Sequence, residues 1–122
     1  MPNQAKIIAV VDDDSSMLKA IERLLGAYGF NTRVFSSAEA FLDSRAANEA
    51  VCLVLDIHLH GISGIELGQR LKAVRSKLPV IFITATDDEV IHREAIELGG
   101  VACLQKPFSP DSLISAINKA TN

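Results

Sequence analysis

Carboxylates follow two of the most apolar stretches of this sequence. The run "IIAVV" leads directly into Asp12, Asp13 and Asp14, and the run "VCLVL" leads into Asp56. Neighbouring carboxylates raise each other's pKa unless a positive charge offsets them, and an acid that ends a buried segment needs a partner or a ligand. A hard divalent cation such as Mg²⁺ would meet both needs, because it prefers charged oxygen ligands. The alternative for the first three acids is a solvated loop in which Asp14 caps a helix.

A hydroxyl and an ammonium group stand at the ends of two further apolar runs. Thr84 ends "PVIFIT", and Lys106 follows "VACLQ". Each residue alone carries little information, because threonine is common in strands and most lysines are solvated. Together with a metal-binding group of acids, they could cradle a phosphoryl group beside one reactive carboxylate. The fold must therefore bring the ends of these four runs to one place.

Short apolar runs alternate with helical patterns along the whole chain. Strands are predicted at 6–11, 31–35, 51–55, 80–84 and 101–105, and helices at 15–29, 36–46, 64–75, 87–100 and 109–120. Strands that are apolar on both faces and alternate with helices predict a parallel sheet covered on both sides. In such doubly wound sheets the site lies at the carboxyl ends of the strands. If the first and third strands are neighbours, Asp12, Asp13 and Asp56 should converge at that edge, with Thr84 and Lys106 on the adjoining strands.

Side chains that accept hydrogen bonds mark the expected helix starts. For the helix at 36–46, Ser36 fits the pattern of a capping box and Ser37 is a rival cap. The helix at 87–100 is expected to be capped by Asp87 or Asp88. Ser109 is the expected cap of the last helix, which has a proline at its first turn.

The bulk properties fit one compact domain, which we place at residues 1–122. The net charge of −3 offers no basic surface for nucleic acid, and no apolar run approaches the roughly 20 residues of a membrane span. The start of the chain, "MPNQAKIIAVVDDD", lacks the pattern of a signal peptide. We therefore expect a cytoplasmic protein that binds neither membrane nor nucleic acid and keeps Cys52 and Cys103 reduced.

Taken in order, these motifs resemble the receiver domain of bacterial two-component response regulators. The resemblance runs from "VVDDD" through "LVLDIHLHGISGIEL" and "PVIFITA" to "LQKPF", and "FSSAEAFL" and "ISGIEL" are similar to the FixJ-like branch. It implies a flavodoxin-like (βα)5 fold with a five-stranded parallel sheet in the order 2-1-3-4-5. It also implies that the protein is a phosphorelay switch and not a turnover enzyme. Its only reactions would be its own phosphorylation and dephosphorylation.

The resemblance assigns a role to each acid of the expected cluster. Asp56 would be the phosphoryl acceptor. Mg²⁺ would be held directly by Asp13, with Asp12 assisting through water, and also by Asp56 and the backbone carbonyl of His58. The cation would explain why three adjacent acids are tolerated at the end of a buried strand.

The same resemblance implies how the signal enters and leaves. Thr84 would hydrogen-bond the phosphoryl group, Lys106 would pair with its charge, and the Lys106–Pro107 bond is expected to be cis. The phosphoryl donor would be a sensor histidine kinase. The face built from the fourth helix, the fifth strand and the fifth helix would then control an effector, such as a C-terminal DNA-binding domain beyond this chain. A dimer that forms on phosphorylation also fits the family.

Two residues depart from the family's usual pattern. His60 stands where proline is usual, which frees a backbone donor, and we expect a solvent-exposed loop histidine. Cys103 stands where an aromatic ring commonly rotates inward, and a thiol lacks the bulk to do so. We therefore predict that signalling relies on Thr84 and residues 85–88. A disulfide between Cys103 and Cys52 is not expected, because two strand spacings, about 9.6 Å, exceed the bridging limit of ~7 Å.

Three other functions compete with a phosphoryl-accepting switch. A phosphatase of the haloacid-dehalogenase type would use Asp12 as its nucleophile, but Asp56 and "QKP" would then lack a role. A flavodoxin-like nucleotide binder needs a glycine- or hydroxyl-rich loop where the three acids stand. A receiver-like module that never takes phosphate would not need the complete set of acids, hydroxyl and lysine. The identity of the aspartate that becomes phosphorylated separates the phosphatase from the switch, and a visible spectrum after incubation with flavin tests the nucleotide binder.

Overall fold

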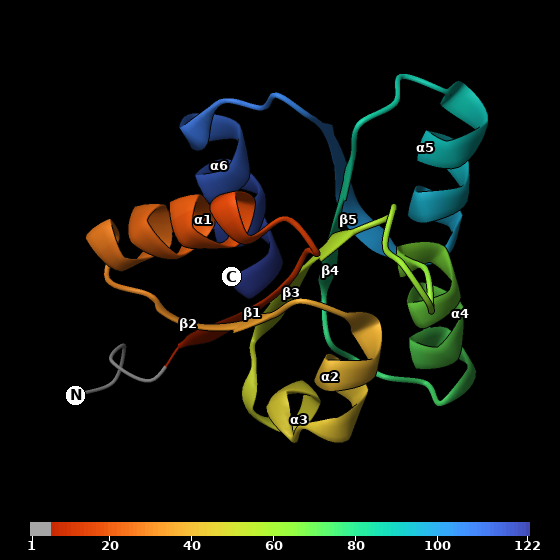
Figure 1. Cartoon of the computed structure of the whole chain (residues 1–122), viewed down its shortest axis with the longest axis horizontal. Coiled ribbons are helices and arrows are strands. Elements are labelled where there is room, and N and C mark those ends of the chain that lie inside the picture. The colour runs from red at the N-terminus through yellow and green to blue at the C-terminus, as the bar shows by residue number, and fades with distance from the viewer. Residues whose placement is uncertain (1–5) are drawn as a thin grey trace.

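The fold is an open parallel sheet with helices on both faces (Figure 1). A computed structural model describes residues 6–122, so residues 1–5, where part of the signal-peptide prediction falls, lie outside the described residues. The strands are β1 (Ile7–Val11), β2 (Asn31–Phe35), β3 (Cys52–Asp56), β4 (Val80–Thr84) and β5 (Gly100–Gln105). The helices are α1 (Ser15–Ala27), α2 (Ala38–Asp43), α3 (Ala46–Glu49), α4 (Gly64–Ala73), α5 (Glu89–Glu97) and α6 (Pro110–Thr121).

The five strands are all parallel and follow the order β2-β1-β3-β4-β5, as predicted. Val11 is level with Leu55, so the residues after them in β1 and β3 emerge side by side at the carboxyl edge. Asp56 is level with Ile83, and Thr84 with Gln105. The register therefore brings the ends of β1, β3, β4 and β5 to one edge of the sheet.

Alternate residues of the strands point into two separate apolar layers. Ile8 and Val10 of β1 pack in the layer that is covered by α1 and α6. Ala9 and Val11 pack in the opposite layer, which is covered by the helices from α2 to α5. β3 and β4 are buried at every position. This is the two-sided burial that continuous apolar strands predict.

The helix starts follow the predicted caps except at one position. Asp14 accepts hydrogen bonds from the first turn of α1, Asp88 caps α5, and Ser109 caps α6. The predicted capping box at Ser36 is wrong, because the rival Ser37 accepts the hydrogen bond from Ala40 N and α2 begins after it.

The predicted helix at 36–46 is shorter in the structure, where α2 ends at Asp43 and a separate short helix, α3, begins at Ala46. Ser44 is the C-cap of α2, and its hydroxyl donates to the carbonyl of Phe41 and accepts from the backbone N–H of Ala46. α3 begins after Arg45, whose side chain makes no capping hydrogen bond. The fourth and fifth predicted helices are consequently α5 and α6.

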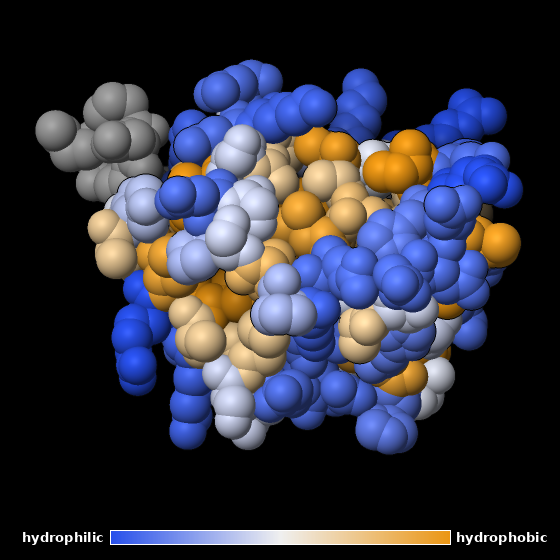
Figure 2. Space-filling view, turned by 90° about the horizontal axis from the view of Figure 1, so that it is seen from above, coloured by the Kyte–Doolittle hydropathy of each residue, from blue (hydrophilic) through white to orange (hydrophobic). Residues whose placement is uncertain are grey.

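β5 is an edge strand that is only partly buried along most of its length. In Figure 2, hydrophobic residues gather in the middle of one face and hydrophilic residues border them. Cys103 of β5 is half-buried, whereas Cys52 of β3 is buried and its pKa is raised to about 12 by that burial. Both thiols are free, and β4 lies between their strands. Within residues 6–122, no helix is long and apolar enough to cross a membrane.

Candidate functional site

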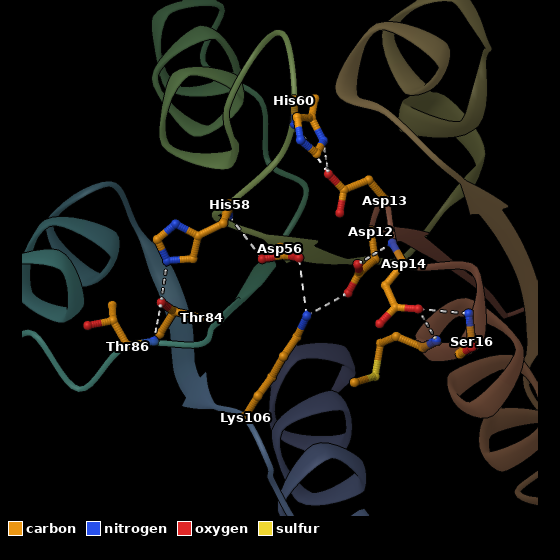
Figure 3. Close-up of polar contacts among 11 residues, drawn as sticks. Asp12, Asp13, Asp14, Ser16, Asp56, His58, His60, Thr84, Thr86 and Lys106 are labelled. Carbon is orange, nitrogen blue, oxygen red and sulfur yellow. Dashed lines mark hydrogen bonds and ion pairs between the residues drawn. The ribbon is translucent and has the colours of Figure 1, made fainter.

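Three acids from the ends of β1 and β3 form one cluster. Asp12, Asp13 and Asp56 each offer a carboxylate oxygen, and these oxygens lie within 4.8 Å of one another (Figure 3). Asp12 is 1% exposed and Asp56 is 4% exposed, whereas Asp13 is open to solvent. Asp14 turns away to cap α1. The alternative of a plain loop and cap therefore holds for Asp14 but does not account for Asp12 and Asp13, which join Asp56 in the cluster.

The Lys106 ammonium group lies between the two buried acids. Its Nζ is 3.0 Å from Asp12 Oδ2 and 3.2 Å from Asp56 Oδ2. Its backbone N–H donates to the carbonyl of Thr84 at 2.8 Å, which anchors the end of β5 to β4. The following bond to Pro107 is cis, as predicted.

Burial and pairing act differently on the two ends of the Asp12–Lys106 pair. Burial raises the pKa of Asp12 above its ordinary 3.8, although hydrogen bonds from the Asp14 backbone and Lys106 oppose this. Burial alone would lower the pKa of Lys106, but the hydrogen bond to Asp12 and the charge of Asp56 outweigh it, so the pKa rises above 10.5. Lys106 therefore remains charged at neutral pH.

The cluster is electrostatically incomplete without a further cation. When the three acids are ionised, one ammonium group faces three carboxylates among these four residues. All the clustered ligand atoms are oxygens, and Asp13 leaves one side open to water. A hard divalent ion that keeps several waters suits this donor set. The residues present therefore fit Mg²⁺.

Asp56 is held by two different donors. The backbone N–H of His58 donates to Oδ1 at 3.0 Å, and Lys106 donates to Oδ2 at 3.2 Å. Thr84 is completely buried, and its Oγ1 lies 2.9 Å from His58 Nε2 and accepts from Thr86 N at 3.2 Å. The predicted site residues are thus brought together, but the Thr84 hydroxyl contacts His58 and not Asp56 (Figure 3).

The loop after Asp56 is attached to the cluster by His60. As expected, its side chain is exposed, with 98% of its surface accessible. Its Nδ1 nevertheless lies 2.7 Å from Asp13 Oδ2, and its backbone N–H donates to the same oxygen at 3.3 Å. Proline, which is usual at this position, could not supply that backbone donor.

Glu39 of α2 supports the far side of the same loop. Its Oε2 accepts from the backbone N–H of Ile62 at 3.1 Å, and this hydrogen bond lowers the pKa of Glu39. Gly61 lies against the carboxylate with a φ of 76°, where a β-carbon would collide with Glu39. The loop position is therefore fixed from both ends.

The sequence reasoning missed the side-chain roles of His58, His60 and Glu39. The one available signal was the exceptional His60, whose freed backbone donor is now seen to bond Asp13. The contact between His58 and Thr84 joins residues 26 positions apart and depends on a side-chain rotamer, so no local sequence pattern predicts it.

Comparison with known sequences and structures gives a consistent result. Residues 8–118 match the family described as the response regulator receiver domain. The chain is 39% identical over 113 residues to the transcriptional regulatory protein FixJ of Bradyrhizobium diazoefficiens, covering 93% of this chain and 55% of that protein. It is 33% identical over 120 residues to the response regulator protein TodT of Pseudomonas putida, covering 98% of this chain and 53% of that protein. The chain thus spans about half the length of the curated relatives it matches.

Solved structures show the same architecture. The response regulator StyR superposes with a TM-score of 0.89 at 37% identity, covering 96% of this chain and 59% of that one. The crystal structure of FixJ-N superposes with a TM-score of 0.86 at 32% identity, covering 97% of this chain and 94% of that one.

Proposed function

The chain belongs to the response regulator receiver domain family, and on that basis we propose that Asp56 accepts a phosphoryl group and thereby switches the domain. The observation that carries this proposal is the Lys106 ammonium group, which contacts Asp56 within a cluster of acids suited to a divalent cation. A nucleophilic carboxylate, a cation and an oriented lysine are the parts that phosphoryl transfer requires.

Asp56 attacks the phosphorus atom in line and displaces the imidazole of a phosphohistidine on a sensor histidine kinase. One carboxylate oxygen forms the new O–P bond while the N–P bond of the donor breaks, and the electron pair leaves with the imidazole. Lys106 stabilises the negative charge on the transferring oxygens, because its pKa lies above 10.5 and it remains protonated. The backbone N–H of His58 orients the carboxylate.

Asp13, Asp56 and the backbone carbonyl of His58 would hold Mg²⁺, and Asp12 would assist through water. When bound, the ion supplies positive charge to the phosphoryl oxygens. The acyl phosphate on Asp56 is later hydrolysed by water, so the domain resets itself and does not turn over a substrate.

The output surface is the face formed by α5, β5 and α6. Thr84 ends β4 and leads through residues 85–88 into α5, so a change at its hydroxyl reaches α5 over one short loop. Phosphorylation biases an existing equilibrium of this face. A transcriptional effector is supported by the similarity to FixJ, a transcriptional regulatory protein. A phosphorylation-dependent dimer and a cytoplasmic location remain predictions.

The rival phosphatase reading would make Asp12 the nucleophile. Asp12 and Asp56 are held alike, each with Oδ1 bonded by a backbone N–H and Oδ2 by Lys106, so hydrogen bonding does not distinguish them. The family assignment favours Asp56, since the matched region covers both acids in the order typical of receivers.

Intact-mass measurement after incubation with acetyl phosphate and Mg²⁺ tests the proposal. The parent chain should gain one phosphoryl group, and chelation of Mg²⁺ should prevent the gain. Asp56→Asn should abolish labelling, whereas Asp14→Asn, which removes a charge outside the cluster and keeps an oxygen able to cap α1, should label normally. An Asp56→Asn variant that labels as well as the parent would overturn the assignment.

A further inference from the structure

His58 connects the acceptor carboxylate to the Thr84 hydroxyl. Its backbone N–H donates to Asp56 Oδ1 at 3.0 Å, and its side-chain Nε2 lies 2.9 Å from Thr84 Oγ1. Figure 3 shows the imidazole ring reaching from the loop after β3 toward Thr84 at the end of β4. The His58 residue is exposed, whereas Thr84 is completely buried.

The contact continues from Thr84 to α5 through Thr86. The backbone N–H of Thr86 donates to Thr84 Oγ1 at 3.2 Å. The carbonyl of the same residue lies 3.0 Å from Nε2 of His92, which belongs to α5. A continuous series of hydrogen bonds therefore runs from His58 across the loop to the helix of the proposed output face.

We propose that His58 is a positioning residue that retains the Thr84 hydroxyl and so sets how readily the switch responds to a phosphoryl group on Asp56. This inference rests on the proposed function. The Asp56 oxygens bond His58 N and Lys106, and no hydrogen bond joins them to Thr84 among residues 6–122. For the hydroxyl oxygen to reach a phosphoryl group on Asp56, it must leave its 2.9 Å contact with the imidazole.

The consequence is a competition for one hydroxyl. A hydroxyl group has one proton and two lone pairs. Thr86 N–H donates to one lone pair, and in the tautomer in which Nε2 of His58 is the acceptor, the imidazole takes the proton that a phosphoryl oxygen would need. His58 adds a second partner that stabilises the retained position and gives nothing to the phosphoryl-bound position. The apparent affinity for a phosphoryl mimic is therefore the intrinsic affinity multiplied by the fraction of molecules in which the Thr84 hydroxyl is released.

Replacing His58 by alanine should remove one hydrogen bond that stabilises the retained position of Thr84. The loss of one hydrogen bond changes the equilibrium constant between the retained and released positions roughly two- to tenfold. His58→Ala should therefore bind beryllofluoride, a phosphoryl mimic, about two- to tenfold more tightly at saturating Mg²⁺. His58→Gln, whose amide can reach the same hydroxyl, should stay close to the parent.

A second measurement needs neither metal nor phosphoryl mimic. The amide resonance of Thr86 reports its hydrogen bond to Thr84 Oγ1. In metal-free His58→Ala it should move away from its position in the metal-free parent. His60→Ala is the matched control for this resonance. It removes another exposed imidazole of the same loop, one whose partner is Asp13 and not Thr84, so the Thr86 resonance should stay in place.

The outcomes separate this inference from the proposed function. If His58→Ala leaves the Thr86 resonance where His60→Ala leaves it, or binds beryllofluoride as well as or more weakly than the parent, the restraint is refuted. If the parent itself neither binds beryllofluoride nor takes a phosphoryl group, the proposed function fails, and the metal-free Thr86 resonance still decides whether His58 restrains Thr84.

Discussion

Replacing Gly64 by alanine would push directly on the backbone of the proposed acceptor. Gly64 is buried at the first position of α4, and its N–H donates to the carbonyl of Ile57 at 3.0 Å. An added β-carbon would collide with the backbone oxygen of Asp56 and would lie 2.7 Å from Ile57 Cα and 2.9 Å from the Asp56 carbonyl carbon. None of these is a flexible side-chain atom, so the backbone itself must move.

The size of the effect follows from these distances. Ordinary contact for a β-carbon begins near 3.4 Å, so the 2.7 Å approach to Ile57 must open by more than half an ångström. Such overpacking typically costs about 1–3 kcal/mol, and the better helix propensity of alanine returns at most about 1 kcal/mol. We expect a net loss of roughly 1–2 kcal/mol. Displacement of Asp56 should also slow phosphorylation about tenfold, since a 1 Å misplacement can cost about a hundredfold.

Urea unfolding and the rate of labelling by acetyl phosphate measure the two effects. Gly26→Ala is the matched control, because Gly26 is also helical but a β-carbon there meets nothing within 4 Å. This control should gain about 0.5–1 kcal/mol and label at the parent rate. A Gly64→Ala variant as stable as the Gly26→Ala variant, or one labelled at the parent rate, would refute the reasoning.

Three further outcomes are expected. Asp13→Asn should weaken the stabilisation of the fold by Mg²⁺ more than Asp14→Asn, because Asp14 only caps α1, and equal losses would contradict the placing of the metal. Asp12→Asn should raise the free energy of unfolding in urea at pH 7. Burial holds the native pKa of Asp12 above 3.8, so its contribution to stability is fully present below pH 3.8 and is lost as pH rises through the native value. The gain should vanish below pH 3.8, and a loss at pH 7 would mean that the ion pair of Asp12 outweighs its burial. Cys103→Ala should leave phosphorylation-induced chemical-shift changes on α5 and β5 nearly intact, whereas Thr84→Ala should shrink them. Their disappearance in phosphorylated Cys103→Ala would place that residue in the relay.

The convergence of the site residues could be predicted because parallel-sheet geometry leaves little freedom. Once β1 and β3 are neighbours, acids that end both strands must meet, and the pairing of Val11 with Leu55 bears this out. Lys106 follows for the same reason, because β5 lies beside β4 at the same edge. Periodicity located the strands and the residues that end them, and the resemblance to receiver domains supplied the strand order that makes those ends meet.

The contacts of the loop after Asp56 could not be predicted in the same way. His58 and His60 point to different partners, Thr84 and Asp13, although they stand only two positions apart. The directions of the two imidazole rings depend on the local backbone and on side-chain rotamers, which the hydrophobic periodicity of the sequence does not predict. The end of α2 was missed for a related reason, since its C-cap Ser44 is marked by a single side-chain hydrogen bond to Phe41.

The central claim is that Asp56 carries the phosphoryl group, and chemical trapping tests it most directly. Borohydride reduces an aspartyl phosphate to homoserine, so treatment of the acetyl phosphate-labelled chain marks the acceptor permanently for peptide mass mapping. We predict homoserine at position 56 and unmodified aspartate at Asp12, Asp13 and Asp14, with no mark when Mg²⁺ is chelated. Homoserine at position 12 or 13 with aspartate intact at 56 would contradict the account.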